Sequence, residues 1–287
     1  MRGSIEELHV EGRAALRLRN AAGDEVVVLK HGAQVLSWKT ADGIDRMYVS
    51  PSAAVEGQPV RGGVPVIFPQ FNLRGPDFSL PRHGFARTLS WTPLEQPAGA
   101  DPDTLQLVLA LEDSPDSRLL WPFAFALQLQ VALRPGELTV RLVVHNRSDQ
   151  EMPFTAALHT YFAVAMDSVA LHGLDGCQKL DTLVNEPGVA GTGPLQPRGP
   201  IDDIFFGVSR PLTLESSQGR VRIDMQSGFH DVVVWNPGEK NARNINDMPD
   251  EDWQKMLCVE AACIGQPVVL GPGERWNGAQ VMTALSA

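Results

Sequence analysis

The sequence predicts an all-β protein, built as a large antiparallel β-sandwich with few short helices. Many short apolar runs alternate apolar and polar residues, as half-buried antiparallel strands do. Gly, Pro, Asn and Asp separate these runs, and the 287 residues include 22 Pro and 26 Gly. That density of helix-breaking residues disfavours long helices, and no long segment shows a helical period.

The elements follow from these patterns in chain order. Strands are expected at 25–30, 34–38, 104–111, 125–133, 137–145, 220–225, 231–235, 255–261 and 280–283. Segment 132–140 (ALRPGELTV) indicates a hairpin that turns at Pro135 and Gly136. A short helix is expected near 249–254 (PDEDWQ), because Pro and acidic residues suit a first helical turn. Two long loops are expected, at 185–200 and 236–252.

Length and composition limit the classes of protein to consider. All-β domains of about 200–250 residues occur as single units, so we expect one domain over 1–287. The 24 Lys and Arg against 34 Asp and Glu give a net charge of -10, which argues against a nucleic-acid partner. No apolar segment approaches the roughly 18 residues of a membrane span, and the N-terminus lacks a secretory pattern. We therefore expect a cytoplasmic monomer with no membrane partner.

Cysteine and histidine spacing predicts no metal site. The three cysteines, Cys177, Cys258 and Cys263, show no CxxC spacing, so neither a disulfide framework nor a zinc site is indicated. The seven histidines are dispersed, without the spacing of metal ligands. We expect no cofactor.

One segment of this acidic chain is basic. Residues 60–87 contain Arg61, Arg74, Arg82 and Arg87 against the single acid Asp77, a local charge of +3 (four minus one). Guanidinium groups match phosphate oxygens, and the Gly-Gly pair of the segment would let its backbone approach a ligand. The segment is therefore a candidate site for a small anion. The alternative is a surface loop whose arginines pair with acids elsewhere.

Three ionisable residues stand in contexts that suit chemistry. His83 lies in the basic segment and could bind or titrate; the alternative is a structural or merely exposed histidine. His159 interrupts the apolar run PFTAALHTYFAV and could act as an acid or base near neutrality; the alternative is a core histidine with satisfied hydrogen bonds. Glu260 follows the apolar run MLCV, where burial would raise its pKa; the alternative is a strand-end glutamate facing solvent.

Further polar residues follow the first long loop. In IDDIFFG, Asp202 or Asp203 could accept hydrogen bonds from sugar hydroxyls, although adjacent aspartates are also ordinary turn residues. Asp231 and Trp235 could wall a pocket, with a purely structural role as the alternative.

Six motifs in one order resemble a known family. They are RGGVPVIFPQF (61–71), PRHGFAR (81–87), ALHTYFAV (157–164), IDDIF (201–205), VVVWNP (232–237) and MLCVEAA (256–262). Together they are similar to the glucose-6-phosphate 1-epimerases, the hexose-6-phosphate mutarotases of the aldose 1-epimerase superfamily. The resemblance implies a galactose mutarotase-like β-sandwich, also called a supersandwich, and a metal-independent reaction at the anomeric carbon.

The same resemblance implies roles for particular residues. His159 of the HTYF motif and Glu260 of the CVE motif look like the catalytic pair. Arg61 of RGG and Arg87 of HGFAR look like substrate or phosphate ligands, and His83 resembles a sugar-contacting residue.

Three positions depart from the family pattern. The substrate-binding aspartate falls on Asp202, but its usual acidic and basic neighbours are missing, so Asp203 stays an alternative. Arg82 stands where family members often have Gln or Ser, either as a further phosphate contact or as simple variation. Ala163 replaces the usual Asn after HTYF, which leaves the histidine in place but alters its surroundings.

Three hypotheses follow. The first is a mutarotase for a hexose 6-phosphate, in which Glu260 removes the O1 proton and His159 supplies one to the ring oxygen O5. The second is an aldose 1-epimerase for unphosphorylated sugars, which the basic segment disfavours. The third is a non-catalytic carbohydrate-binding β-sandwich, which the presence of both His159 and Glu260 disfavours.

Overall fold

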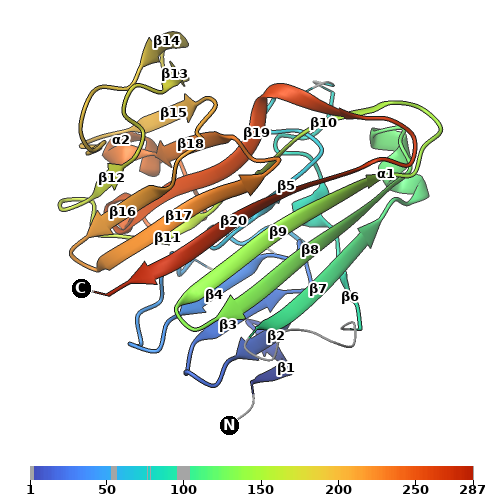
Figure 1. Ribbon diagram of the computed structural model, residues 1–287, viewed down its shortest axis with the longest axis horizontal. Helices are drawn as coiled ribbons and strands as arrows, with labels where there is room; N and C mark the ends of the chain where they lie inside the picture. The colour runs from blue at the N-terminus through green and yellow to red at the C-terminus, as the bar shows by residue number, and fades with distance from the viewer. Residues whose placement is uncertain (1–2, 53–56, 76, 78, 96–103, 287) are drawn as a thin grey trace.

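Three antiparallel sheets form the protein in the computed structural model, which describes residues 3–52, 57–75, 77, 79–95 and 104–286 (Figure 1). The first sheet consists, in order, of β1 (Ser4–Val10), β2 (Arg13–Arg19), β3 (Glu25–Leu29) and β4 (Val35–Lys39). The prediction of an all-β sandwich with few short helices is confirmed.

The second sheet contains the long central strand β19. From one edge to the other its strands are β14 (Glu186–Val189), β13 (Gln178–Asp181), β15 (Ile201–Phe205), β18 (Asp231–Asn236), β19 (Met256–Leu270), β10 (Met152–Leu158) and β5 (Val66–Ile67). The short strand β11 (Tyr161–Ala163) also pairs with β19.

The third sheet holds the longest hairpin of the fold. Its order is β12 (Ala170–His172), β16 (Leu212–Ser216), β17 (Gly219–Ser227), β20 (Arg275–Leu285), β9 (Glu137–Asn146), β8 (Phe125–Arg134), β7 (Leu105–Glu112) and β6 (Thr92–Pro93). Strands β20, β9, β8 and β7 run side by side across the front of Figure 1.

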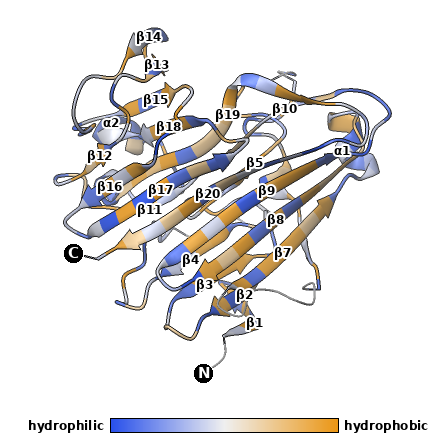
Figure 2. Cartoon of the chain, in the orientation of Figure 1, coloured by the Kyte–Doolittle hydropathy of each residue, from blue (hydrophilic) through white to orange (hydrophobic). Residues whose placement is uncertain are grey.

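Alternation along β8 explains why these residues form strands. Leu127, Leu129 and Val131 are fully buried, while Gln128 and Gln130 between them are partly exposed. Successive strand side chains point to opposite faces of a sheet, so one face joins the core and the other meets water. Figure 2 shows the resulting bands of hydrophobic and hydrophilic residues along β8 and β9. The inward faces of all three sheets contribute to one hydrophobic cluster.

The predicted hairpin is present between β8 and β9. Arg134 pairs with Glu137, which leaves Pro135 and Gly136 as the two-residue turn. Gly136 has a φ of +68°, a conformation that glycine adopts without strain.

Both predicted long loops contain regular structure. Within 185–200, β14 forms an edge strand that pairs with β13. Pro187 has no N–H to donate, but an edge strand has no further neighbour on its outer side, so proline is tolerated there. Within 236–252 lies the helix α2 (Gly238–Ala242), which is too short to produce a helical period. The helix predicted near 249–254 is a 3₁₀ helix, η2 (Asp252–Lys255), and a second one, η1 (Ala86–Thr88), was not predicted.

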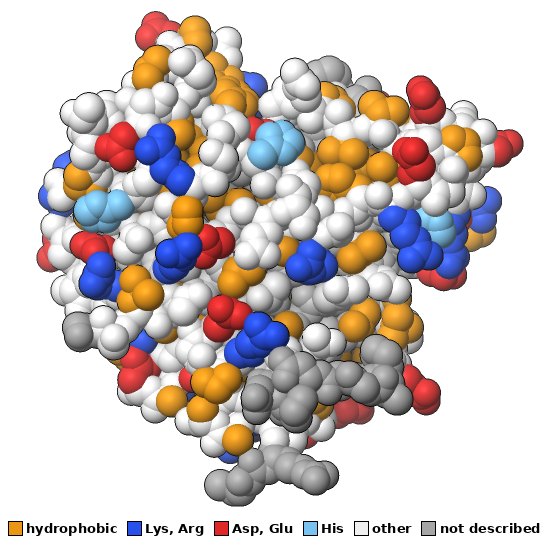
Figure 3. Space-filling model, in the orientation of Figure 1, with side chains coloured by type: hydrophobic (Ala, Val, Ile, Leu, Met, Phe, Trp, Pro, Cys, Tyr) orange, Lys and Arg blue, Asp and Glu red, His pale blue; other side chains and the backbone are white. Residues whose placement is uncertain are grey.

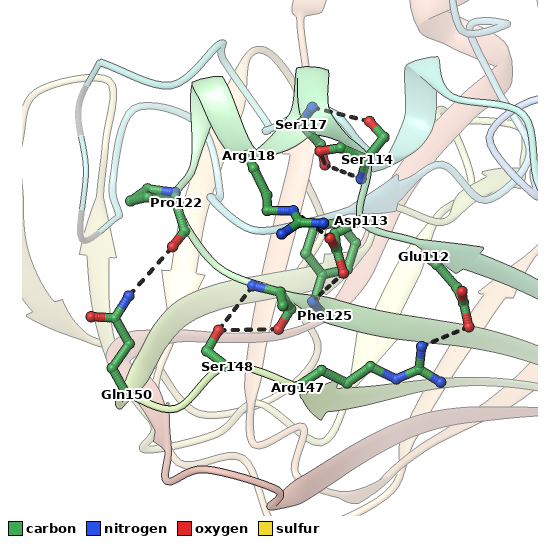
Figure 4. A network of polar contacts seen from close by, with 11 residues as sticks. Glu112, Asp113, Ser114, Ser117, Arg118, Pro122, Phe125, Arg147, Ser148 and Gln150 are labelled. Carbon is green, nitrogen blue, oxygen red and sulfur yellow. Dashed lines mark hydrogen bonds and ion pairs between the residues drawn. The ribbon is translucent and has the colours of Figure 1, made fainter.

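Helix α1 (Pro115–Leu120) was also missed, although its cap is local (Figure 4). The Ser114 hydroxyl accepts from the Ser117 N–H at 3.1 Å, and the Ser117 hydroxyl accepts from the Ser114 N–H at 2.8 Å. The neighbouring Asp113 carboxylate binds Arg118 at 2.7 Å and the backbone N–H of Phe125 at 2.9 Å. These contacts fix α1 against the start of β8.

The face seen in Figure 3 carries acidic and basic side chains interspersed, without one sign dominating. Among the described residues, no helix has the length and apolarity that crossing a bilayer requires. Cys177, Cys258 and Cys263 are free thiols.

Candidate active site

One cavity of about 240 Å³ collects the residues that the sequence singled out. Its walls come from the basic segment 60–87, the junction between β10 and β11, strands β15, β18 and β19, and the segment after α2. Every predicted site residue lines it, namely Arg61, Arg82, His83, Arg87, His159, Asp202 and Glu260.

His159 and Glu260 face each other at the centre of the cavity. His159 lies where the chain leaves β10, and Glu260 lies in the middle of β19, paired with Val233 of β18. The His159 Nδ1 is 3.5 Å from the Glu260 Oε1. His159 is 8% exposed and Glu260 only 1%, so the solvent-facing alternative for Glu260 is wrong.

Neither side chain has its hydrogen bonds satisfied. Within the part of the chain that the structure describes, the His159 Nδ1 and the Glu260 Oε2 are buried without a hydrogen-bond partner. The alternative of a satisfied core histidine is therefore wrong. Buried polar groups without partners are costly, and they concentrate at functional sites.

Burial shifts the pKa values of the two groups in opposite directions. Loss of solvent raises the pKa of Glu260 well above its usual value, and the charge of Asp202 adds to the effect. Loss of solvent lowers the pKa of His159 well below its usual value, and His83, Arg87 and Arg61 lower it further. Burial therefore favours the neutral form of each group, the carboxylic acid of Glu260 and the uncharged imidazole of His159.

Two aromatic rings wall the histidine. Tyr161 stacks on His159 with centroids 4.8 Å apart, and Trp235 meets the same imidazole edge-on at 6.2 Å. Of the two roles that the sequence left open for Trp235, a pocket wall is the one observed, whereas Tyr161 was given no role although it stands in a quoted motif. Asp231 lies outside the cavity, and its carboxylate accepts the backbone N–H groups of Ile264 and Gly265. Of the two roles considered for Asp231, the geometry therefore supports the structural one.

The basic segment delivers four arginines to the cavity. Arg61 donates from Nε to Asp247 at 2.6 Å. For this one arginine, the alternative that the basic segment pairs with acids elsewhere in the chain is therefore correct. For Arg74, Arg82 and Arg87, the described residues offer no carboxylate within ion-pair distance, and the Arg87 Nε is buried without a partner. Three guanidinium groups without an ion-pair partner in one cavity make it a candidate anion site.

His83 is held as a neutral donor. Its Nδ1 accepts the backbone N–H of Asn72 at 3.2 Å, which places the ring proton on Nε2. Burial lowers the pKa of His83 to about 3, with Arg87, Arg82 and Arg61 contributing. The ring meets His159 edge-on at 5.6 Å and lines the cavity, so His83 is not an exposed residue.

The two adjacent aspartates lie on opposite faces of β15. Asp202 lines the cavity, and burial raises its pKa. Asp203 is 3% exposed, does not line the cavity, and binds Lys179 at 2.7 Å. The strand pleat therefore presents Asp202, not Asp203, to a ligand.

The Gly-Gly pair serves a different purpose from the one expected. A Cβ on Gly62 would overlap the carbonyl oxygen of Tyr48, and one on Gly63 would overlap that of Val35. Both glycines have positive φ values, +128° and +59°. The close approach is thus to the protein's own backbone beside β4, and it anchors Arg61 rather than contacting an anion.

Sequence analysis missed several residues around the cavity. Arg74 was counted in the basic segment but not proposed as a ligand, and Asn72, Thr182 and Ile245 were not considered. Asp247 lies in the expected loop 236–252. The length of that loop was the feature of the sequence that could have indicated a functional residue there. Among the described residues, no group of three or more His, Cys, Asp or Glu side chains is arranged to hold a metal ion.

Comparisons with known proteins point to one family. The model of the aldose 1-epimerase family matches residues 14–283. A protein of Cenchrus ciliaris, provisionally named glucose-6-phosphate 1-epimerase, is 31% identical over 93% of this chain and 84% of its own length. An Escherichia coli K12 protein with the same provisional name is 31% identical over 80% of this chain and 77% of its own.

Solved structures share the fold. A provisionally assigned mutarotase from Salmonella typhimurium superimposes with a TM-score of 0.88 and 24% identity, over 99% of this chain and 94% of that one. A galactose mutarotase-like protein from Clostridium acetobutylicum gives a TM-score of 0.76 and 18% identity, over 100% of this chain and 99% of that one. The expected supersandwich is confirmed.

Proposed function

This chain belongs to the aldose 1-epimerase family, and on that premise we propose that it interconverts the α and β anomers of a hexose 6-phosphate, such as glucose 6-phosphate. The prediction of an isomerase is confirmed by the family. The observation that carries the choice of substrate is a buried, partnerless His159–Glu260 pair in a cavity with three unpaired arginines.

The proposed reaction moves two protons. Opening the sugar ring requires the O1 hydroxyl to lose a proton while the ring oxygen O5 gains one. Glu260 accepts the O1 proton and His159 donates to O5, each transfer worth roughly 10²–10⁴-fold in rate. The aldehyde then rotates about C1–C2, and the ring closes on the other face with the two roles reversed.

The charge of the substrate helps to set the protonation state. In the free protein, burial and then the cations around His159 lower the pKa of the imidazole, and burial raises the pKa of Glu260. A phosphate bound to Arg61 and Arg87 adds negative charge near His159, which favours the protonated imidazole. The proposed reaction begins from the state in which His159 carries the proton and Glu260 is a carboxylate.

The remaining residues hold the sugar in this proposal. Arg61 and Arg87 bind the phosphate, with Arg82 at the open rim as a further contact. The Nε2–H of His83 donates to a sugar oxygen, and the Asp202 carboxylate accepts from hydroxyl groups. The cytoplasmic location, the monomeric state and the single domain stay predictions.

Saturation-transfer NMR on glucose 6-phosphate tests the roles of the pair. We expect Glu260→Gln and His159→Ala each to abolish most of the enzyme-catalysed anomer exchange. Undiminished exchange in either variant would remove the role given to that residue. Comparing the rates on glucose 6-phosphate and on free glucose tests the substrate class, and a preference for free glucose would favour the unphosphorylated alternative.

A further inference from the structure

We propose that Asp247 is the positioning residue for Arg61, holding this guanidinium so that its free donors face a phosphate group. The proposal rests on the function proposed above, because it concerns the same anion site. Asp247 belongs to the segment between α2 and η2, 186 positions from Arg61 along the chain, and binds its Nε at 2.6 Å. Asp247 itself lies outside the set of residues that line the cavity.

The contacts of Arg61 leave most of its donors free. A guanidinium has five N–H donors. Asp247 takes the Nε donor, and the Tyr161 hydroxyl takes one Nη1 donor at 3.3 Å. Three donors therefore stay available, so Asp247 can orient the group while donors on Nη1 and Nη2 are left for a phosphate.

The segment that carries Asp247 is itself fixed. The Asn236 side chain donates to the carbonyls of Trp253 at 2.8 Å and Met256 at 2.7 Å, which closes the segment at its base. Met248, next to Asp247, is 3% exposed and packs in a cluster with Tyr48 and Tyr161. A rigid support lowers the entropy cost of holding a long arginine side chain in one orientation.

A competing effect has the opposite sign. The Asp247 side chain is 43% exposed, and its negative charge repels a phosphate dianion bound to Arg61. Removing the carboxylate weakens phosphate binding if orientation dominates and strengthens it if repulsion dominates. The 2.6 Å contact fixes the plane of the guanidinium, whereas solvent screens the charge of the exposed carboxylate, so orientation is the larger effect.

Inorganic phosphate is the probe, with binding measured by titration calorimetry on the full chain. We expect Asp247→Ala to weaken phosphate binding about tenfold and to raise KM for glucose 6-phosphate similarly, with kcat changing less. Asp247→Asn should restore binding to within about threefold of the original protein, because its amide oxygen still accepts the Nε–H. Equal or tighter binding by Asp247→Ala, or equal weakening in Asp247→Asn, would overturn the proposal.

Asp250→Ala is the matched control. Asp250 is exposed on the same segment, and the structure gives its side chain no ion pair or hydrogen bond among the described residues. This variant removes the same charge without touching Arg61, so its phosphate binding should not change; a tenfold loss there would assign the effect to the segment as a whole rather than to the contact with Arg61, and would overturn the proposal. Asp247→Ser repeats the test should Asp247→Ala unfold.

The two proposals fail in different ways. If the original protein does not accelerate anomer exchange of glucose 6-phosphate, the proposed function fails, whereas the phosphate titrations still measure the role of Asp247. If exchange is catalysed but phosphate binding does not depend on Asp247, only the positioning role fails.

Discussion

The imidazole of His159 and the phenol ring of Tyr161 lie face to face, 4.8 Å apart and 9° from parallel. The Tyr161 hydroxyl also accepts a hydrogen bond from Arg61. Burial raises the pKa of Tyr161, so the hydroxyl stays neutral. One ring thus connects the proposed phosphate ligand to the proposed acid.

Tyr161→Phe separates the two contacts of this ring. The variant keeps the stack on His159 but loses the hydrogen bond to Arg61, which is worth roughly 1.5–3 kcal/mol for a charged donor. We expect KM for glucose 6-phosphate to rise by about tenfold or more, with kcat nearly unchanged. Steady-state kinetics checks this, and Tyr161→Ala, which also loses the stack, should lower kcat as well. A fall in kcat alone in the Phe variant would contradict the assignment.

Glu260→Gln should lower the catalytic activity and raise the free energy of unfolding at neutral pH. The unfolded chain ionises Glu260 above its usual pKa, near 4.5, whereas the folded protein keeps it protonated to higher pH. The original protein therefore loses stability as pH rises above that value, by about 1.4 kcal/mol per pH unit while the two states differ by one proton. The variant lacks this loss. Urea unfolding at pH 5 and pH 7 should show its advantage growing with pH; a constant difference would argue against a raised pKa.

His83 acts on stability in the opposite direction. Its pKa is about 3 in the folded protein, below the usual value of 6.5. As pH falls from 6.5 towards 3, the unfolded chain takes up a proton that the folded protein does not, so stability falls by about 1.4 kcal/mol per unit.

The substitution His83→Asn removes this dependence. Asn also tolerates the positive φ of +68° at position 83. Urea unfolding between pH 4 and pH 6.5 should therefore give a shallower slope for the variant than for the original protein. Identical slopes would show that His83 titrates normally.

Arg87→Gln tests the preference for a charged substrate. The Arg87 Nε is buried without a partner among the described residues, and its Nη2 donates to the Arg82 carbonyl at 3.1 Å. Loss of a charge-assisted bond to phosphate should raise KM for glucose 6-phosphate by roughly ten- to a hundredfold. Turnover of free glucose should change little. Arg243→Gln, at an exposed arginine paired with Glu239, is the control; equal effects on both sugars would refute a phosphate contact.

The sequence predicted those parts of the fold that local patterns determine. Alternation along β8 and β9 and the Pro135-Gly136 turn are visible within a few residues, and both were correct. Helix α2 was missed because five residues are too few to show a helical period. Strand β14 was missed because Pro187 and its neighbouring glycine are typical of loops.

The candidate site was found through motifs, but its geometry was not. Sequence alone left Asp202 and Asp203 as alternatives, because the choice depends on which face of β15 meets the cavity. The pairing of Arg61 with Asp247 depends on contacts across 186 positions, which no local pattern contains.

The position of Glu260 in the middle of β19 also bears on how this protein could be altered. Its strand is held by β18 on one side and by β10 and β11 on the other. The arginines, by contrast, come from the connecting segment 60–87. Substitutions that change the substrate preference can therefore be confined to connections between strands. The strands that hold the proposed proton-transfer groups need not change.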